Sequence, residues 1–348
     1  MTTIAINGLG RIGRAFLKAA LQHEELRVVA VNDLIDPENL VYLLRFDSSY
    51  GRYHQAVAYE PGVEPTLQVG RASMRLLRER EPARLPWRKL GVDIVVEATG
   101  AFAAFDKARA HITAGAQRVV LTAPAKDADA ADARTVLVGV NEDQLDVSVL
   151  SSNGSCTTNS ASPVMQVLKE TIGVKKALLN TVHAYTSSQS LVDGPARGRD
   201  FRKGRAAAVN IIPASTGAAI AVGRAIPELR GRFDGLAMRV PVLTGSISSI
   251  AFLAGRRTSA EEINQHLEEA SRQARWSKVM AVSRDPLVSS DIVGDPHAAI
   301  VDLSLTKVVD EDLCSVYSWY DNEYGYTNSL VQHVTAVAAA LNTRATLP

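Results

Sequence analysis

The chain has little of what marks a secreted, membrane-embedded or nucleic-acid-binding protein. Only two of its 348 residues are cysteine, too few for a disulfide framework. Lys plus Arg number 38 and Asp plus Glu number 37, so the formal net charge of +1 provides no overall basic field for nucleic acid or membrane surfaces. No apolar run approaches the roughly 20 residues of a membrane helix, and the N-terminal MTTIAING lacks the regions of a signal peptide. These absences predict a soluble, cytoplasmic protein.

The length and the order of the apolar segments predict two domains. At 348 residues the chain exceeds the size at which one hydrophobic core usually stops growing. Residues 1–155 alternate short apolar runs with helical patterns, which is typical of a doubly wound α/β domain with a parallel sheet. The predicted elements are strands at Thr3–Asn7, Leu26–Asn32, Val92–Glu97, Arg118–Thr122, Thr135–Val138 and Val147–Ser151, and a helix at Ala15–His23.

Residues 156–327 have longer, more alternating apolar segments, which indicate an α+β domain with a large, mostly antiparallel sheet. The C-terminal segment 328–342 has the pattern of an amphipathic helix. The predicted elements of this second half are strands at Ala177–Thr181, Gly235–Pro241, Ser246–Leu253, Ala299–Ser304 and Leu313–Trp319, and helices at Ser160–Thr171, Ala214–Ile226 and Ser259–Trp276.

A glycine motif near the N-terminus predicts a dinucleotide-binding site. Gly8, Gly10 and Gly13 form G-x-G-x-x-G directly after the first predicted strand and at the start of a helical pattern. In this context the first glycine permits a tight turn, the second lets the backbone approach a pyrophosphate, and the third allows close helix–strand packing. Asp33 ends the next strand about 20 residues later, where a carboxylate binds ribose hydroxyls and repels a 2′-phosphate. The pattern therefore predicts NAD as the cofactor.

The segment Ser151–Ser160, SSNGSCTTNS, contains the best candidate nucleophile. Cys156 follows a predicted strand and an Asn-Gly turn, and it precedes a helical pattern rich in Ala, Val and Leu. A thiol at a helix N-terminus is expected to have a lowered pKa, because the helix dipole favours the thiolate. The neighbours of Cys156 are hydroxyl and amide side chains, whereas Cys314 lies in the strand-like LCSVYSW and is predicted to be a buried structural residue.

A cysteine nucleophile needs a base, and His183 is the best candidate among seven histidines. It ends a predicted strand and is followed by Thr186, Ser187 and Ser188. An imidazolium at His183 would stabilise a Cys156 thiolate and move protons. Spacing alone does not place the two side chains together, so their pairing is an expectation. Surface or packing roles suit the others better: His23, His54, His111, His266, His297 and His333.

Two segments are locally basic. The residues from Arg71 to Lys89 include seven basic and two acidic side chains, a pattern that predicts a solvated surface segment. The segment Arg197–Arg205, RGRDFRKGR, is punctuated by glycine and is predicted to be a loop. This loop either faces an anion or is an ordinary surface loop.

At these residues the chain closely resembles the phosphorylating glyceraldehyde-3-phosphate dehydrogenases, essentially from end to end. The resemblance implies a Rossmann NAD-binding domain at residues 1–155, against which a C-terminal helix at 328–342 packs, and a catalytic domain at 156–327. It also implies a homotetramer and a place in glycolysis. The motifs that carry it, in order, are NGLGRIGR, SNGSCTTNS, HAYTSSQ, GRAAAVNIIPASTGAA, RVPV and WYDNEYGYTN.

The resemblance implies a two-stage reaction on D-glyceraldehyde 3-phosphate. Cys156 would attack the aldehyde to form a hemithioacetal, and His183 would accept the hydroxyl proton as hydride passes to NAD. Inorganic phosphate would then cleave the thioester and release 1,3-bisphosphoglycerate. The backbone N–H of Cys156 and the side chain of His183 would stabilise the developing oxyanion.

Cofactor-binding and phosphate-binding residues are implied by the same resemblance. Asn322 would orient the nicotinamide carboxamide. The rest of the cofactor cleft would be lined by the three glycines and Asp33 together with Asn7, Arg11, Ile12, Arg80, Thr99 and Thr122. One anion site would use Ser155, Thr157, Thr216 and Gly217, and the other Thr186, Ser188 and Arg239. Hydroxyl groups with a few cations suit the recognition of phosphate.

Several positions depart from the family pattern without removing a group that the mechanism requires. Lys203 stands where many members have Arg, which would replace a bidentate phosphate contact by a point charge. Ile220 replaces a common Lys, and Gly194 replaces a frequent Leu. Arg239 precedes V-P-V-L-T-G-S instead of V-P-T-P-N-V-S, and the loop Asp193–Asp200 is about two residues longer than in typical bacterial members.

Other functions on this scaffold are weighed against the resemblance. Erythrose-4-phosphate dehydrogenase shares the fold, the cysteine and the histidine, but Thr186 and Ser188 favour the triose and phosphorolysis. Aspartate-semialdehyde dehydrogenase lacks the HAYT and WYDNEYGY motifs. A dinucleotide-dependent thiol sensor or binding protein without catalysis is a different class, and the complete set of Cys156, His183 and Asn322 argues against it.

Overall fold

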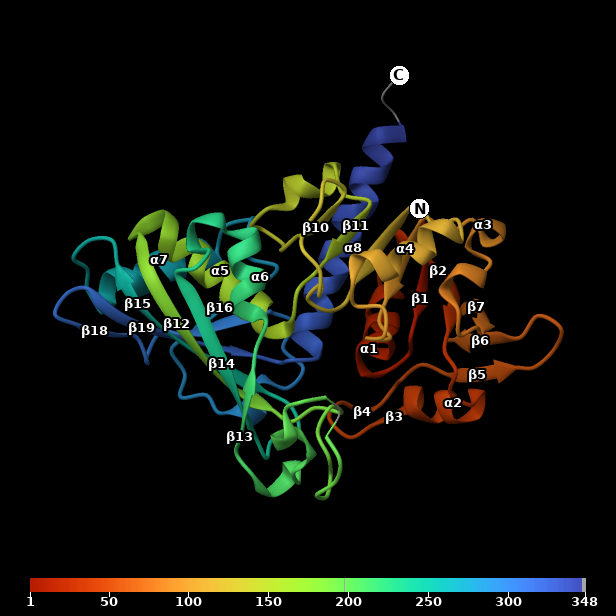
Figure 1. The fold of residues 1–348 in the computed structure, drawn as a ribbon, viewed down its shortest axis with the longest axis horizontal. Coiled ribbons are helices and arrows are strands. Elements are labelled where there is room, and N and C mark those ends of the chain that lie inside the picture. The colour runs from red at the N-terminus through yellow and green to blue at the C-terminus, as the bar shows by residue number, and fades with distance from the viewer. Residues whose placement is uncertain (197, 346–348) are drawn as a thin grey trace. The chain divides into compact units, whose positions relative to one another are not determined.

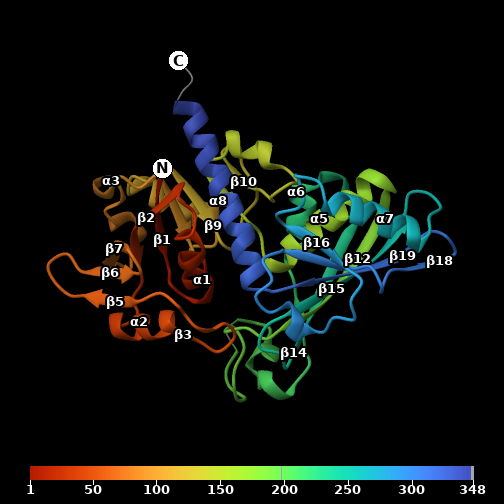
Figure 2. The same ribbon diagram turned by 180° about the vertical axis from the view of Figure 1, so that it is seen from behind.

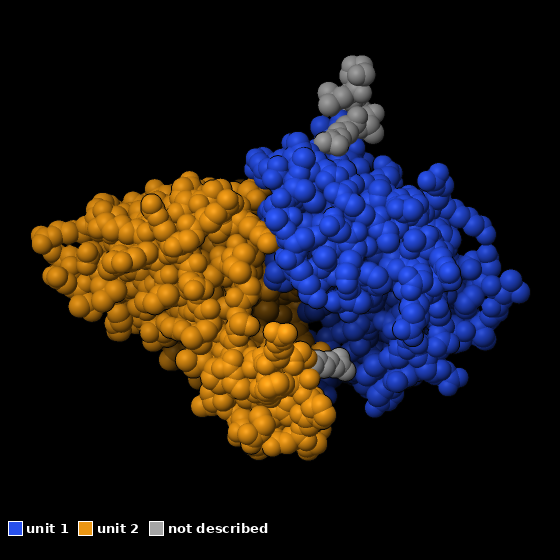
Figure 3. Space-filling model, viewed as in Figure 1, with its two compact units in different colours: residues 1–136, 142–154, 330–348 blue, residues 137–141, 155–329 orange. Residues whose placement is uncertain are grey.

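The computed structural model describes residues 1–196 and 198–345 of the chain. Contacts divide the chain into two compact units, coloured separately in Figure 3. Unit 1 comprises residues 1–136, 142–154 and 330–348, and unit 2 comprises residues 137–141 and 155–329. Each unit has its own sheet and its own hydrophobic core. No helix in the described part of the chain is long and apolar enough to cross a membrane.

Unit 1 is built around a sheet that, within the described residues, has nine strands (Figures 1 and 2). The strands from β10 to β7 are parallel, while β7, β6 and β5 pair antiparallel. The order across the sheet is β10 (Ala133–Thr135), β11 (Leu150–Ser152), β9 (Arg118–Leu121), β8 (Ile94–Glu97), β1 (Thr2–Asn7), β2 (Leu26–Asn32), β7 (Ala72–Leu77), β6 (Thr66–Val69) and β5 (Val57–Glu60).

The direction in which the chain adds strands reverses between β1 and β8. The chain runs from β1 to β2 on one side, and it later adds β8 and β9 on the other side of β1. In an open parallel sheet the ligand crevice lies at such a switch point, outside the carboxyl ends of the strands. Asn7 and Glu97 end β1 and β8 and are paired in register. The topology therefore places any dinucleotide site beside these two residues.

Helices and the end of the chain cover the sheet of unit 1. Leu330, Val334 and Val337 of α8 (Tyr324–Ala345) are buried in one core cluster with residues of β1 and α1, so the predicted packing of the C-terminal helix is confirmed. His333 of this helix is fully buried, and its Nε2 lies 2.7 Å from Ser151 Oγ. The other helical segments of unit 1 are α1 (Arg11–Ala20), α2 (Pro37–Arg45), α3 (Trp87–Leu90), α4 (Phe105–Thr113), and 3₁₀ turns at Pro82–Arg84 and Glu142–Asp146.

The antiparallel strands β5, β6 and β7 were not expected from the sequence. Their short segments carry polar and charged residues between the apolar ones, as strands with one less buried face do. β7 contains part of the basic segment that was predicted to be solvated. Its Arg75 is only 24% exposed and forms an ion pair of 2.5 Å with Glu64, whereas Arg71, Arg78 and Arg80 are exposed as predicted.

Unit 2 contains a mixed sheet that has eight strands in the described chain. β12 with β14 and β16 with β17 pair parallel, and the remaining pairs are antiparallel, so a mostly antiparallel sheet is confirmed. The order is β13 (Ile212–Ser215), β14 (Phe233–Val240), β12 (Val174–Ala184), β15 (Ser246–Ala254), β19 (Leu313–Tyr320), β17 (Ala299–Asp302) and β16 (Met280–Ser283), with β18 (Lys307–Val309) on β19.

The two faces of this sheet differ. Helices α5 (Cys156–Thr171), α6 (Ala218–Ala225) and α7 (Ala260–Ser271) lie on one face (Figures 1 and 2) and share a core with Leu179 and Phe252. On the other face, apolar side chains of β12 and β14 remain exposed in the chain alone: Leu178 60%, Val182 39%, Leu236 39% and Met238 38%.

Several predicted elements differ at their boundaries, among them one helix and one strand. The helix expected over Ala214–Ile226 begins only at Ala218, because Ile212–Ser215 forms the edge strand β13. Pro213 has no N–H to donate and is tolerated at an edge. The strand expected at Thr135–Val138 lies instead at Ala133–Thr135.

Two arginines of the basic loop predicted around Arg197–Arg205 are paired with acids. Arg202 Nε lies 2.8 Å from Asp200 Oδ1, and Arg205 Nε lies 2.8 Å from Asp193 Oδ2. Arg197 lies outside the described residues. The described contacts favour an ordinary surface loop over one that faces an anion.

Candidate active site

Cys156 is the first residue of helix α5, in unit 2. Ser155 caps the helix, because its Oγ accepts the N–H of Thr158 at 3.1 Å, and Thr158 Oγ1 in turn accepts the N–H of Ser155 at 3.1 Å. This reciprocal cap explains why the helix starts four residues earlier than the apolar pattern predicted. It leaves Cys156 fixed at the positive end of the helix dipole.

The predicted pair of cysteine and histidine is brought together. Cys156 Sγ lies 3.3 Å from His183 Nε2. His183 lies near the end of β12, where alternate residues Leu179, Thr181 and His183 are buried on the face that carries the helices. The period of two along the strand therefore directs the imidazole toward the start of α5.

The other ring nitrogen of His183 has two competing neighbours. Nδ1 lies 2.7 Å from the carbonyl oxygen of Ala184 and 2.6 Å from Nη1 of Arg239, the residue paired in register with His183 on β14. The carbonyl can only accept and the guanidinium can only donate, so the tautomer selects one of them. When Nδ1 carries the proton it donates to Ala184, and Nε2 is then an acceptor facing the thiol.

Burial and the positive charge of Arg239 shift the pKa values of this pair. Burial and the nearby Arg239 both act to lower the pKa of His183, which is about 3. Burial raises the pKa of the Cys156 thiol, while Arg239 and hydrogen bonds from Thr157 act to lower it. The expectation of a lowered thiol pKa is therefore wrong in this structure, because the desolvation of the thiolate outweighs the helix terminus. These shifts favour a thiol beside a neutral imidazole.

Replacement of Arg239 by methionine is expected to slow the alkylation of Cys156 about tenfold at a fixed pH. Loss of the nearby positive charge disfavours the thiolate and raises the thiol pKa further. The pH–rate profile for iodoacetamide should shift to higher pH. Arg239→Lys keeps the charge and is the matched control, with a profile close to the wild type. Identical profiles for the methionine variant and the wild type would contradict this electrostatic role.

Sequence reasoning missed a hydroxyl cluster behind this pair. The buried Tyr320 hydroxyl lies 2.9 Å from Thr157 Oγ1 and 2.6 Å from Thr181 Oγ1, and its ring packs edge-on against His183 with centroids 5.9 Å apart. Burial raises the pKa of Tyr320, so it stays a phenol. Thr157, predicted to bind an anion, is 4% exposed and uses its side chain here. The alternation of buried and more exposed residues along β12 and β19 was the sequence signal that could have indicated this cluster.

The remaining predicted anion residues lie at loop and helix starts of unit 2. Thr186 Oγ1 and Ser188 Oγ are 2.9 Å apart on the surface after β12. Thr216 Oγ1 accepts the N–H of Ala218 at 3.2 Å, and Gly217 precedes the first turn of α6. Ile220, in α6, is 65% exposed.

The glycine motif of unit 1 has the geometry that its spacing predicts. Gly8 has a φ of +98°, and a Cβ there would meet the backbone of Thr99. A Cβ on Gly13 would collide with the carbonyl oxygen of Gly8, so only glycine lets α1 approach β1 this closely. Gly10 is exposed with open space around its Cα, as a backbone that receives a pyrophosphate requires.

Asp33 lies just beyond β2 and is tied to this loop. Its Oδ2 accepts the N–H of Leu9 at 2.5 Å and its Oδ1 accepts the N–H of Ile35 at 2.9 Å. Arg11 donates to Asp47 Oδ1 at 3.2 Å. The other predicted cofactor residues of unit 1 lie at the carboxyl ends of strands or just after them, except Ile12 in α1: Asn7, Arg80, Thr99 and Thr122.

Asn322 lies in unit 2, just after β19. Its Oδ1 accepts the N–H of Gly245 and the hydroxyl of Ser246, each at 3.1 Å. These two bonds fix the orientation of the amide at the start of β15.

Comparison with known proteins shows the family of this chain. Residues 2–105 match the family model described as glyceraldehyde 3-phosphate dehydrogenase, NAD binding domain, and residues 155–322 match the C-terminal domain of the same enzyme. The chain is 47% identical to glyceraldehyde-3-phosphate dehydrogenase of Mycobacterium tuberculosis (strain ATCC 25618 / H37Rv) over 345 residues, 97% of this chain and 99% of that protein. This chain belongs to the glyceraldehyde-3-phosphate dehydrogenase family.

Other members give the same result. The enzyme of Mycobacterium leprae is 46% identical over 97% of this chain and 99% of that protein, and the enzyme of Clostridium pasteurianum is 43% identical over 95% and 97%. The family's NAD-binding domain covers the glycine motif, Asp33 and Thr99. Its C-terminal domain covers Cys156, His183 and Arg239.

Proposed function

We propose that this chain oxidises and phosphorylates D-glyceraldehyde 3-phosphate to 1,3-bisphosphoglycerate with reduction of NAD. The observation that carries the proposal is the contact of 3.3 Å between Cys156 Sγ and His183 Nε2, at the start of α5. A nucleophile beside a neutral base is what a covalent aldehyde oxidation requires. The family assignment of both halves of the chain supports the same reaction.

The base function follows from the tautomer of His183 that donates to Ala184. Nε2 takes the thiol proton as sulfur attacks the aldehyde carbon, and returns it to the oxygen of the hemithioacetal. It takes that proton again as the hydride leaves and the thioester forms. Phosphate oxygen then attacks the thioester carbon, and the carbon–sulfur bond breaks to release the acyl phosphate. The proton on His183 returns to sulfur or to solvent, which restores the pair.

Arg239 is proposed to couple anion binding to this base. A phosphate group attracts the guanidinium and offsets its charge, and the guanidinium lowers the pKa of His183 in this structure. His183 Nδ1 then keeps its proton and donates it to the carbonyl oxygen of Ala184, so Nε2 stays a hydrogen-bond acceptor. Thr186 and Ser188 supply hydroxyls for one proposed anion site. Ser155, Thr157, Thr216 and Gly217 form the other, in which the buried Thr157 side chain supports the site through Tyr320.

The residues of unit 1 fit NAD. The open backbone at Gly10 suits a pyrophosphate, and Asp33 suits the ribose hydroxyls of a dinucleotide without a 2′-phosphate. When bound, NAD supplies the hydride acceptor. Asn322 is proposed to hold the carboxamide, since its own oxygen is already fixed by Gly245 and Ser246.

The test is NADH absorbance with glyceraldehyde 3-phosphate, with and without inorganic phosphate, beside erythrose 4-phosphate and NADP. Turnover of the triose that depends on phosphate and NAD is expected. Phosphate-independent turnover that favours the tetrose would move the assignment to erythrose-4-phosphate dehydrogenase. NAD binding with rapid thiol labelling but no turnover of either sugar would favour a thiol sensor.

We also propose that the protein is a cytoplasmic homotetramer that acts in glycolysis. The exposed apolar side chains of β12 and β14 support self-association, because a contiguous apolar face is costly in water. Both cysteines are free, as is usual in a reducing compartment. Light scattering after size exclusion should give four times the mass of the chain, and a monomer mass would contradict the proposal.

A further inference from the structure

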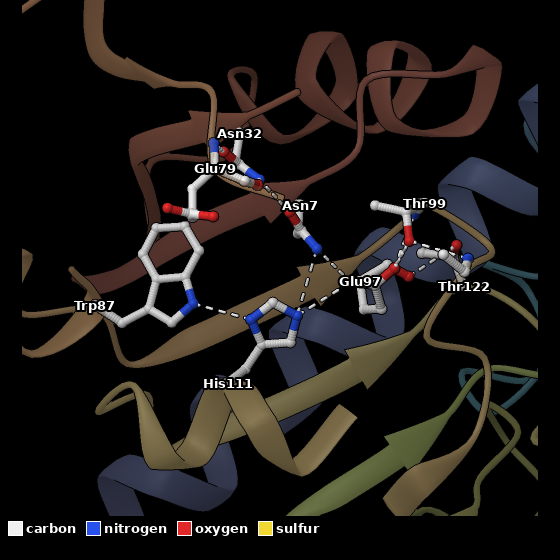
Figure 4. Close-up of polar contacts among 9 residues, drawn as sticks. Asn7, Asn32, Glu79, Trp87, Glu97, Thr99, His111 and Thr122 are labelled. Carbon is white, nitrogen blue, oxygen red and sulfur yellow. Dashed lines mark hydrogen bonds and ion pairs between the residues drawn. The ribbon is translucent and has the colours of Figure 1, made fainter. Parts of the chain in front are cut away.

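A chain of buried polar side chains in unit 1 ends at the proposed dinucleotide site but contains residues that no step above uses. Figure 4 shows Trp87, His111 and Glu97 leading to Asn7 and Thr99. Trp87 and His111 are 0% exposed, Glu97 is 3% exposed and Asn7 is 2% exposed. His111 was expected at the surface or in packing, and the structure buries it completely beside a carboxylate.

Glu97 is the centre of this chain. Its Oε2 accepts Nδ2 of Asn7 at 2.6 Å and Nε2 of His111 at 3.0 Å. Its Oε1 accepts the backbone N–H of Thr99 at 2.9 Å and also the Thr99 hydroxyl. All four partners donate, so the side chain acts as an acceptor only, as an ionised carboxylate does. A buried carboxylate with four donors is fully satisfied and holds each donor in place.

A hydrogen bond from Trp87 sets the tautomer of His111. Trp87 Nε1 lies 3.0 Å from His111 Nδ1, and an indole nitrogen can only donate. Nδ1 must therefore be the acceptor, and the ring proton lies on Nε2, where it is donated to Glu97. The contact of 3.4 Å between Asn7 Nδ2 and His111 Nε2 joins two donors and adds no hydrogen bond.

Asn7 is held from both sides. Its Nδ2 donates to Glu97, and its Oδ1 accepts Nδ2 of Asn32 at 2.7 Å. Asn32 is held in turn by the backbone of Glu79, whose N–H donates to it at 2.8 Å and whose carbonyl accepts from it at 2.9 Å. Every end of the Asn7 amide is thereby oriented at the carboxyl end of β1.

Thr99 is oriented in the same way. Because its hydroxyl proton points at Glu97, its oxygen offers only lone pairs to other groups, and one of these accepts the N–H of Ala101 at 3.1 Å. The hydroxyl therefore presents an acceptor to a ligand that carries hydroxyl or amide donors. Thr99 is exposed, beside the carboxyl end of β8.

We infer that Glu97 is the positioning residue of the dinucleotide site. His111 supports it by donating a hydrogen bond to its carboxylate, and Trp87 supports it by fixing the tautomer of His111. Glu97 orients Asn7 and Thr99, the two side chains at the switch point between β1 and β8, and it touches no reacting atom. The inference rests on the proposed NAD site. It predicts that NAD affinity depends on a carboxylate that does not contact the cofactor.

The chain offers a matched control at the opposite edge of the same strands. Thr3 Oγ1 donates to Asp93 Oδ2 at 2.7 Å, just before β8, and the Thr3 N–H donates to the same oxygen at 2.8 Å. This pair resembles Asn7 with Glu97 in chemistry, but it lies at the amino ends of β1 and β8, away from the switch point. Thr3→Val removes the hydroxyl contacts with Asp93 and with the carbonyl oxygen of Gly91 there, without touching the dinucleotide site.

The experiment compares Glu97→Gln with Thr3→Val by calorimetric titration of NAD and by steady-state kinetics. A glutamine has one acceptor oxygen instead of two, so either Asn7 with His111 or Thr99 loses its partner. We expect the Kd and KM for NAD to rise about tenfold in E97Q, with kcat at saturating NAD changed by less than about twofold. T3V should bind NAD as the wild type does, although both variants unfold at lower urea concentrations.

An unchanged Kd in E97Q, or an equal rise in T3V, would overturn the inference. Absence of NAD binding by the wild type would overturn the proposed function together with it, whereas normal binding by E97Q would overturn the inference alone. If E97Q does not fold, ¹⁵N NMR of the wild-type His111 decides. The Nε2–H tautomer supports the chain of donors, and the Nδ1–H tautomer contradicts it.

Discussion

Cys156→Ser is expected to abolish turnover while it leaves NAD binding intact. An alcohol is far weaker as a nucleophile than a thiol, and a neutral imidazole such as His183 cannot ionise it appreciably. We expect kcat to fall by about 10⁴-fold or more, roughly 5 kcal/mol of activation free energy. The substitution changes one atom, and the helix cap formed by Ser155 and Thr158 is unaffected. The glycine motif and Asp33 belong to unit 1, so the Kd for NAD should stay within about twofold.

Cys314→Ser is the matched control for this prediction. Cys314 is 1% exposed on β19, and burial raises the pKa of its thiol to about 11. It should neither react with iodoacetamide nor take part in turnover. The control variant should keep wild-type kcat, with a modest loss of stability from a buried hydroxyl. Mass spectrometry of labelled wild-type protein should find the label on Cys156 alone. Retained turnover in C156S, or its loss in C314S, would remove the nucleophile assignment.

The parts of the fold that sequence could predict are those where apolar period and glycine geometry agree. β1 and the turn at Gly8 were predicted because a buried parallel strand followed by glycines permits little else. The helix was expected from Ala15, but α1 begins at Arg11. The antiparallel strands β5 to β7 were not predicted, because each is short and has one less buried face. Their pairing depends on neighbours along the sheet and not on their own pattern.

The adjacency of Cys156 and His183 was predictable from the sequence, but the electrostatics of the pair were not. Cys156 and His183 were selected by residue type and by their places at a helix start and a strand end. The direction of the pKa shift of the Cys156 thiol was not predicted, because the sequence shows the helix terminus but not the burial that outweighs it. The contact of Arg239 with His183 depends on the parallel register of β12 with β14, which no spacing reveals.

The hydrogen-bond partners of buried polar side chains could not be predicted from the sequence either. Tyr320 and Asn322 lie in one sequence motif, yet only the fold shows that Tyr320 turns inward to Thr157 and Thr181. His111 lies on a short helix whose pattern gives no sign of a carboxylate partner. Such networks join residues far apart in the chain, and a polar residue in an apolar stripe indicates burial but not the identity of its partner.

His183→Gln is expected to reduce kcat about 10³-fold without weakening NAD binding. A glutamine side chain reaches a similar place, but its amide cannot take a proton from the thiol or from the hemithioacetal. Loss of a positioned general base typically costs between 10² and 10⁴ in rate. Because the pKa of His183 is lowered to about 3, the wild-type base is neutral throughout the neutral range. The wild type should therefore show no loss of activity from protonation of His183 between pH 5 and pH 8, and activity should rise with pH as the thiol ionises.

The glutamine variant should change which step limits the rate. Proton removal and hydride departure occur together, so an aldehyde deuterated at the reacting carbon should show a larger isotope effect in H183Q than in the wild type. His333→Gln is the control, because His333 is also a fully buried histidine, and its Nε2 lies 2.7 Å from Ser151 Oγ, away from Cys156. It should lower stability and leave both kcat and the isotope effect unchanged. A wild-type isotope effect in H183Q, with kcat reduced, would mean that His183 positions Cys156 and does not accept the proton.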